Sequence, residues 1–158
     1  METYDVVVVG AGPGGSGAAI EAARKGLRVL MVEKRQEIGC PKRCGEGLSR
    51  NSAKRIGVKP NPLWVRREIK GATCISPSGK KVTVDYRDGP EGWVIERKMF
   101  DKCLAEDAVR AGARVMARTE VVGLLKEDGM ISGVELESGR KKWKVKAPLI
   151  IAADGVES

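Results

Sequence analysis

Three glycines near the N-terminus have the spacing of a phosphate-binding turn. Gly10, Gly12 and Gly15 fit the pattern G-x-G-x-x-G within Gly10-Ala11-Gly12-Pro13-Gly14-Gly15. In this pattern the first glycine allows a tight turn, the second lets the backbone approach a pyrophosphate, and the third lets a helix pack on a strand. The amides that follow would point at the phosphates, helped by the helix dipole. The spacing therefore predicts a site for a nucleotide diphosphate, although a glycine cluster after a strand can also be only a tight turn.

An acidic residue follows at the distance expected for a ribose contact. The apolar run 27–32 ends in Glu33, about twenty residues past the glycines, where a carboxylate accepts hydrogen bonds from ribose hydroxyls. A carboxylate there also repels a 2′-phosphate, so the pattern favours FAD or NAD over NADP. The alternative for Glu33 is a solvated strand end.

The hydrophobic pattern predicts the elements that hold these residues. Residues 4–9 are mostly β-branched and apolar, as in a strand buried on both faces of a parallel sheet. An alanine-rich helix follows, with Pro13 suited to its first turn. Beyond it we expect helices over 48–56 and 98–111, and strands over 69–75, 81–86, 93–95, 114–117, 119–125, 130–137, 143–146 and 149–153. This order indicates an α/β, Rossmann-like fold with inserted β-strands and a β-meander before the last parallel strand.

Composition excludes several classes of function. The net charge of +8 comes from 29 basic and 21 acidic residues that are mostly dispersed, without the basic stripe and interleaved aromatics of a nucleic-acid-binding protein. Histidine is absent, which removes Ser-His-Asp catalysis and most catalytic zinc sites. We expect no metal site, no nucleic-acid partner, and redox chemistry through a bound cofactor.

The four cysteines indicate a reducing compartment. The chain of 158 residues shows no signal peptide and no apolar run long enough to span a bilayer. Reduced thiols in a cytoplasmic protein are therefore expected, and the positive charge is compatible with peripheral contact with an anionic membrane. Cys40 and Cys44 form a C-x3-C spacing, which is neither the C-x2-C redox motif nor half of a standard zinc site.

Five stretches together resemble a known family. They are the glycine turn, Glu33, Arg43-Cys44-Gly45-Glu46-Gly47, Glu96-Arg97-Lys98-Met99-Phe100-Asp101 and Ala153-Asp154-Gly155. The chain resembles the FAD-binding start of the p-hydroxybenzoate hydroxylase-like flavoproteins, and within them the geranylgeranyl reductase family, especially the archaeal digeranylgeranylglycerophospholipid reductases. The resemblance covers residues 1–158, which we expect to form one FAD-binding domain at the start of a longer flavoenzyme.

The resemblance implies a cofactor site and an activity. FAD contacts are expected from Gly10, Gly12, Gly14, Gly15, Glu33, Arg43, Cys44, Gly45, Gly47, Arg97, Val121, Asp154 and Gly155. The implied reaction is FAD-dependent reduction of the isoprenoid double bonds of archaeal-type ether phospholipids. Cys44 is the candidate catalytic residue, because the neighbouring Lys42 and Arg43 favour its thiolate; a packing or cofactor-shaping role is the alternative.

The partners implied are a prenylated lipid and an electron donor. The donor is left open among reduced ferredoxin, a deazaflavin and a nicotinamide cofactor. Two other functions remain: a flavin-dependent aromatic monooxygenase on the same scaffold, and a dinucleotide-binding module without catalysis.

Overall fold

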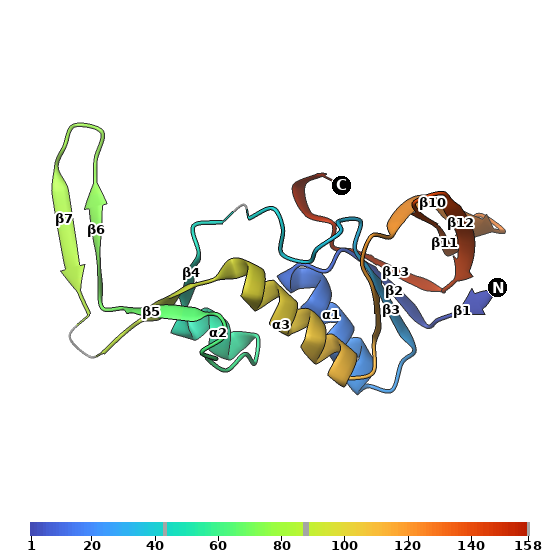
Figure 1. Cartoon of the computed structure of the whole chain (residues 1–158), viewed down its shortest axis with the longest axis horizontal. Coiled ribbons are helices and arrows are strands. Elements are labelled where there is room, and N and C mark those ends of the chain that lie inside the picture. Colours follow the sequence, from blue (N-terminus) through green and yellow to red (C-terminus); the bar gives the residue numbers. More distant parts are fainter. Residues whose placement is uncertain (43, 87–88, 158) are drawn as a thin grey trace. The chain divides into compact units, whose positions relative to one another are not determined.

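The computed structural model describes residues 1–42, 44–86 and 89–157 (Figure 1). These residues fall into two compact units: the first unit comprises Met1–Pro41 and Asp101–Ser158, and the second unit comprises Lys42–Phe100. The boundary between them lies within helix α3 (Arg97–Arg110).

A four-stranded parallel sheet forms the centre of the first unit. Its strands are β13 (Leu149–Ala152), β2 (Val6–Val9), β3 (Val29–Val32) and β9 (Arg114–Met116), in that order. Helix α1 (Pro13–Arg24) connects β2 to β3, which pair in parallel register from Val6 opposite Val29. The four residues of β3 are all buried, as expected for a parallel sheet covered on both faces.

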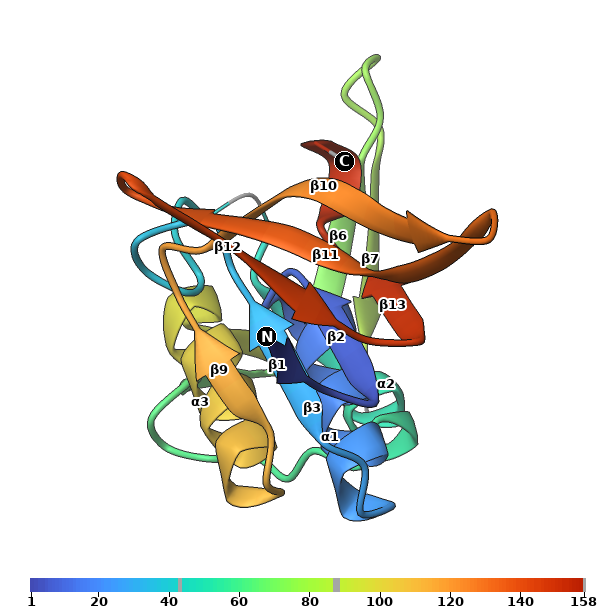
Figure 2. The ribbon, with the colours of Figure 1, turned by 90° about the vertical axis from the view of Figure 1, so that its right-hand side faces the viewer.

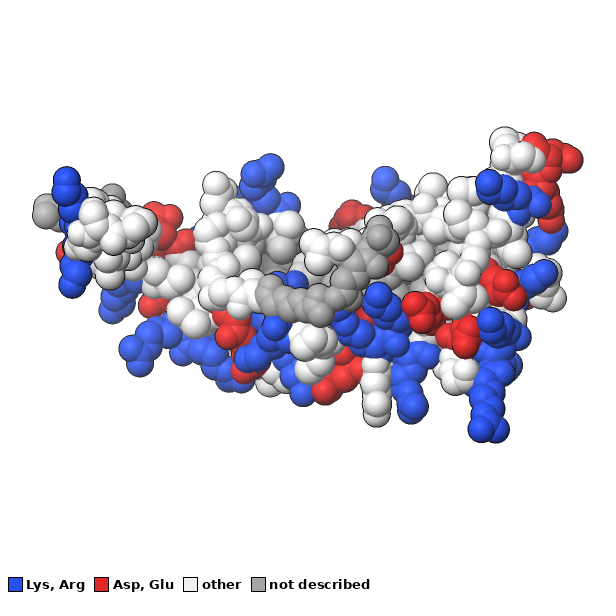
Figure 3. All heavy atoms as spheres, turned by 90° about the horizontal axis from the view of Figure 1, so that it is seen from above, with Lys and Arg blue, Asp and Glu red and all other residues white. Residues whose placement is uncertain are grey.

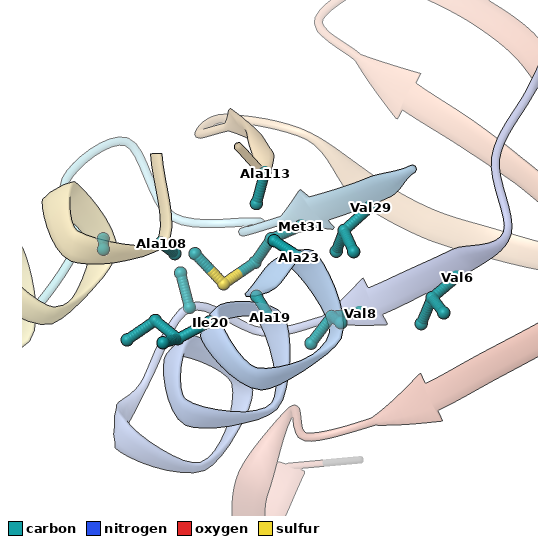
Figure 4. Close-up of a cluster of buried hydrophobic side chains, with 11 residues drawn as sticks. Val6, Val8, Ala19, Ile20, Ala23, Val29, Met31, Ala108 and Ala113 are labelled. Atoms are coloured by element: carbon teal, nitrogen blue, oxygen red, sulfur yellow. The ribbon is translucent and has the colours of Figure 1, made fainter. Parts of the chain in front are cut away.

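One face of the parallel sheet packs on helices. Val8 and Met31 from the sheet meet alanines of α1 and of α3, including Ala19 and Ala108 (Figure 4). The thioether of Met31 lies between α1 and the segment that carries Ala108 (Figure 4). Small residues on both helices allow close approach to the sheet, and the flexible methionine fills the space that remains.

The other face packs on a second, mainly antiparallel sheet. Its order is β1 (Glu2–Thr3), β12 (Lys141–Lys146), β11 (Met130–Ser138) and β10 (Glu120–Glu127), with β1 parallel to β12 (Figure 2). Val7 and Leu30 of the parallel sheet contact Val134, Leu136 and Val145 of this meander, and all five are buried. Because successive side chains of a strand point to opposite faces, Val6 and Val8 of β2 pack against the helices and Val7 packs against the meander.

The second unit contains two smaller sheets. Strands β4 (Gly47–Ser49), β8 (Gly92–Ile95) and β5 (Val65–Ile69) pair antiparallel, and β6 (Gly71–Ile75) forms a hairpin with β7 (Lys81–Asp85). Helix α2 (Arg50–Arg55) follows β4. Trp64 makes edge-to-face contacts with Trp93 and Phe100, at centroid distances of 6.4 and 5.1 Å. These three buried aromatics provide the core of the unit.

The sequence pattern predicts the longer elements in the correct order, but the short strands β1, β4 and β5 were not expected and several bounds differ. A helix is expected from residue 48, but Ser49 accepts a hydrogen bond from the N–H of Ser52 (3.0 Å) and so starts α2 at Arg50. A single strand is expected over 69–75, but the chain changes partner at Lys70, because β5 pairs with β8 and β6 pairs with β7.

The environment of Cys103, the lengths of the helices and the end of the described chain complete the fold. Cys103 is half buried in α3, and burial raises the pKa of its thiol. Among the residues that the structure describes, no helix is long and apolar enough to cross a membrane. The chain ends in a short 3-10 helix, η1 (Gly155–Glu157).

Close backbone contacts around the turn between β2 and α1 require glycine at two positions. Gly10 has φ +100°, and a Cβ added to it would lie 2.4 Å from the carbonyl oxygen of Ala153. A Cβ on Gly15 would lie 1.8 Å from the carbonyl oxygen of Gly10. Both obstacles are backbone atoms, which cannot rotate away as a side chain can. Packing in the apo fold therefore explains these two glycines.

We expect Gly15→Ala to lower the free energy of unfolding by about 2 to 3 kcal/mol, because the helix must move off the strand. Gly17→Ala is the matched control, since a Cβ there meets nothing within 4 Å and alanine should stabilise the helix by up to about 1 kcal/mol. Urea unfolding without added nucleotide measures both. Equal stability of the two variants would contradict the packing argument.

Candidate functional site

The turn between β2 and α1 contains two glycines that packing does not require. Gly12 has φ −75° and ψ −177°, an extended conformation open to any residue, and a Cβ on Gly12 or Gly14 would meet nothing within 4 Å. Substitution would therefore fill open space beside the turn. Such space is what a backbone leaves when a ligand must come close to it.

The start of α1 is suited to an anion. The helix begins at Pro13 with Gly12 as its N-cap, and within the described part of the chain no side chain caps it. Its first turn carries no acidic residue. The first amides of a helix have no partners inside the helix, and the helix dipole places partial positive charge there. The prediction of Pro13 in the first turn is confirmed, and the geometry suits a diphosphate.

Glu33 lies against this turn. Its side chain follows β3 and is only 9% exposed. Oε2 accepts the N–H of Ala11 at 3.0 Å, and Oε1 accepts the N–H of Arg35 at 3.0 Å. The carboxylate therefore joins the glycine turn to the end of β3. Because each carboxylate oxygen can accept two hydrogen bonds, both oxygens keep capacity for a ribose hydroxyl.

Two backbone contacts fix the position of Glu33. Its N–H donates to the carbonyl of Met116 (2.9 Å), and its carbonyl accepts the N–H of Thr119 (2.8 Å). Thr119 is buried and also donates its hydroxyl to the carbonyl of Ala117. The acid is thus held by the segment that leaves β9, whatever ligand is bound.

The last strand brings Asp154 to the same edge of the sheet. The N–H of Ala153 donates to the carbonyl of Val9 (2.8 Å), and the Cα of Asp154 is 3.0 Å from where a Cβ of Gly10 would lie. Asp154 and Gly155 are exposed, and Gly155 begins η1. The structure therefore brings Gly10, Glu33 and Asp154 together, as expected for the carboxyl ends of neighbouring parallel strands.

Val121 is placed by the meander. It lies in β10 opposite Leu136, next to an irregularity between Val121 and Gly123, and its side chain packs on the meander core. The predicted backbone contact of Val121 with an adenine stays a prediction.

The remaining predicted residues belong to the second unit. Cys44 is exposed, and its Sγ accepts the N–H of Glu46 at 3.3 Å. Gly45 and Gly47 are also exposed, and a Cβ on either would meet nothing within 4 Å. Arg43, predicted to contact the cofactor, lies outside the described residues. Arg97 is the first residue of α3.

Glu46 links the Cys44 loop to α3, a role that the sequence did not indicate. Its Oε1 accepts the backbone N–H of Arg97 (3.1 Å) and pairs with Lys42 Nζ (3.2 Å). The hydrogen bond from Arg97, followed by the one from Lys42, lowers the pKa of Glu46. Lys42 also pairs with Glu96 at 3.2 Å, and the bonds to Glu46 and Glu96 raise its pKa. The basic charge of Lys42 expected beside Cys44 is therefore shared between two carboxylates.

Surface charge around these elements is locally balanced. In the face shown by Figure 3, basic side chains are interspersed with acidic and uncharged ones. Many exposed cations have an acidic partner: Arg24 with Glu21, Arg110 with Glu106 and Asp107, Lys142 with Glu137, and Lys146 with Glu127. Within the described ranges, no group of three or more Cys, Asp or Glu is placed to hold a metal ion.

We expect Glu33→Gln to destabilise the protein by about 1 to 3 kcal/mol even without nucleotide, because one buried backbone N–H would face an amide nitrogen instead of a carboxylate oxygen. Glu21→Gln, an exposed acid on α1 paired with Arg24, is the control and should change stability by less than about 0.5 kcal/mol. Urea unfolding of the nucleotide-free protein tests this. If Glu33→Gln unfolds like the control, the carboxylate does not brace the turn.

Comparison with known proteins agrees with this geometry. The family described as FAD dependent oxidoreductase matches residues 5–155. The digeranylgeranylglycerophospholipid reductase of Methanothrix thermoacetophila is 50% identical over 98% of this chain, and that of Methanocaldococcus jannaschii is 50% identical over 99%. This chain spans 40% and 39% of their lengths.

A solved structure gives the same result. The geranylgeranyl bacteriochlorophyll reductase-like protein of Thermoplasma acidophilum matches 99% of this chain, and this chain covers 40% of it, with a TM-score of 0.94 and 44% identity. The expected resemblance and fold class are confirmed. The chain belongs to the FAD-dependent oxidoreductase family.

Proposed function

We propose that this chain is the FAD-binding part of an enzyme that saturates the geranylgeranyl chains of archaeal-type ether phospholipids. The similarity to reductases named for such a lipid supports the substrate class. The observation that carries the proposal is the glycine turn, where Gly12 leaves space that the fold does not need, directly beside the carboxylate of Glu33.

The residues present fit the adenosine diphosphate portion of FAD. The amides at the start of α1 would bind the pyrophosphate, and Gly12 and Gly14 would let it approach. Glu33 would accept hydrogen bonds from the ribose hydroxyls with the capacity left on its two oxygens. Asp154 and Gly155, at the same edge of the sheet, would bind nearer the flavin end. Arg97, Gly45 and Gly47 would complete the cofactor contacts from the second unit.

The reaction requires a proton as well as a hydride. An isolated alkene has no carbonyl to accept hydride, so one carbon must gain a proton while its neighbour gains the hydride. Reduced FAD, when bound, supplies the hydride. We assign the proton-handling group to Cys44, whose thiol is exposed on a loop and held by the N–H of Glu46.

Partners follow from this chemistry. A prenylated phospholipid is the substrate, and its insolubility favours peripheral contact of the enzyme with a membrane. Reduced ferredoxin, a deazaflavin or a nicotinamide cofactor would return two electrons to the enzyme after each saturation.

The full-length protein should be yellow as purified and should saturate geranylgeranyl lipid anaerobically when supplied with a reductant. Mass spectrometry of the lipid would record two added hydrogen atoms for each double bond removed. The three donor classes are compared in the same assay. Oxygen-dependent hydroxylation of an aromatic compound without alkene saturation would favour a monooxygenase, and a colourless protein would contradict the cofactor.

Gly12→Val should raise the dissociation constant for FAD by about tenfold or more, because the added side chain would occupy the space beside the pyrophosphate. A Cβ at Gly12 meets no protein atom within 4 Å, so the cost in stability without FAD should not exceed the roughly 1 kcal/mol of a poorer N-cap residue. Gly17→Ala is the control and should bind FAD normally. Unchanged FAD affinity in Gly12→Val would place the diphosphate elsewhere.

Cys44→Ala should retain FAD but lower kcat by about a hundredfold or more, the typical contribution of a positioned proton donor. Flavin absorbance confirms cofactor content before turnover is measured. Cys74→Ala provides a second exposed cysteine as control. Full turnover of Cys44→Ala with FAD bound would remove Cys44 from the chemistry.

A further inference from the structure

Glu46 has a backbone conformation that a glycine would adopt more easily. Its φ is +57°, in the left-handed region that side chains disfavour. It stands between Gly45 and Gly47, in a loop where a Cβ on either neighbour meets only open space. Glutamate costs more than glycine at such a position, so the contacts that its side chain makes in return are of interest.

The contacts of Glu46 show what the side chain does. Through Oε1 it accepts the N–H of Arg97 at 3.1 Å, although the two residues are 51 positions apart. The first turn of α3 contains no acidic residue of its own. A helix leaves its first N–H groups without internal partners, and a carboxylate is favoured there by the helix dipole. Glu46 therefore supplies the acceptor at the start of α3.

The backbone of Glu46 also makes two hydrogen bonds, one to Cys44 and one to β8. Its N–H donates to Cys44 Sγ (3.3 Å), and its carbonyl accepts the N–H of Ile95 (2.8 Å). Lys42 bridges the carboxylates of Glu46 and Glu96, at 3.2 Å from each. Glu96 is the residue before α3, and its carbonyl accepts the N–H of Phe100. One side chain and its backbone thus connect the Cys44 turn, β8 and the start of α3.

We propose that Glu46 is a positioning residue, whose carboxylate fixes Cys44 and the backbone of Arg97 relative to each other. This inference deepens the proposed function, because it concerns a predicted catalytic thiol and a predicted FAD contact. The carboxylate acts through its neighbours and need not touch substrate or cofactor.

Three variants of the full-length protein separate the side chain from the backbone. Glu46→Gly removes the carboxylate and relieves the backbone strain at this position. Glu46→Ala also removes the carboxylate but keeps the strain. Glu46→Gln keeps an oxygen that can accept the N–H of Arg97. If the carboxylate positions the loop, both Glu46→Gly and Glu46→Ala should lose the protection of the Arg97 amide and of the Cys44 thiol. Glu46→Gln should retain most of this protection.

The first measurements need no cofactor. Exchange of the Arg97 amide with solvent deuterium should be about tenfold faster in Glu46→Gly than in the parent, with Glu46→Gln close to the parent. Alkylation of Cys44 by iodoacetamide should also quicken in Glu46→Gly, because the backbone N–H of residue 46 that binds the sulfur is no longer fixed in place by the carboxylate. Cys74, also exposed, is the internal control and should react at an unchanged rate.

Acid should convert the parent to the behaviour of Glu46→Gln. The pKa of Glu46 is lowered in the folded protein, so its contribution is complete above the ordinary range of glutamate, near about 4.3, and is lost as the pH falls through the lower folded value. Lys42, whose pKa is raised, stays charged throughout. Protonation leaves Glu46 with a neutral acceptor like that of Glu46→Gln, so Arg97 protection, corrected for intrinsic exchange, should fall on acidification in the parent only to the level of Glu46→Gln and stay flat in that variant. Glu96→Gln controls for the second carboxylate facing Lys42.

The proposal is overturned if Glu46→Gly leaves both Arg97 exchange and Cys44 alkylation at parental rates. It is also overturned if Glu46→Gln behaves like Glu46→Gly, since a conservative acceptor should restore the helix start. Failure of the proposed function has a different signature, because a parent protein without flavin would still show the exchange and alkylation changes. With FAD bound, Glu46→Gly should also show a raised dissociation constant.

Discussion

The close approach of helix α1 to strand β2 is the constraint on which the first unit depends. A Cβ at Gly15 would lie 1.8 Å from the carbonyl oxygen of Gly10, so the helix must begin directly where the strand ends. Its first amides then point across the carboxyl edge of the parallel sheet rather than into the core. Met31 and the alanines of α1 and α3 keep the helices against the sheet (Figure 4). The geometry that would bind an anion is thus a consequence of packing within the protein.

Glu33 is held in place in the same way, in the part of the site that we propose for the ribose. A carboxylate only 9% exposed needs hydrogen-bond donors, and here the donors are the amides of Ala11 and Arg35. The acid that would select a ribose is therefore also part of the turn that would bind the diphosphate. The specificity against a 2′-phosphate that we propose for Glu33 and the stability of the turn would then come from the same side chain.

Local spacing in the sequence was enough to predict the glycine turn, the place of Glu33 after β3 and the order of the longer elements, because these features depend on residues close together in the chain. It was not enough for contacts made between distant segments. Strands β1 and β4 contain two and three residues, and they exist only through pairing with β12 and β8. The break at Lys70 depends on which partner each strand finds. The role of Glu46 could not be predicted from local spacing, because the backbone N–H from which it accepts a hydrogen bond is 51 residues away.

Two kinds of residue in this chain are not explained by packing of the protein itself: glycines where a side chain would fit, and a side chain where glycine would cost less. Gly10 and Gly15 are glycines that backbone packing demands, whereas Gly12 and Gly14 are glycines in open space that the apo fold does not require. Glu46 is the converse, a charged side chain at φ +57°, where glycine would cost less. The first kind of residue leaves space for a ligand, and the second retains a carboxylate despite strain. Neither feature identifies a site by itself, since Gly17 also has open space and Arg118 also has a positive φ. Each points to function here because it lies beside Glu33 or Cys44.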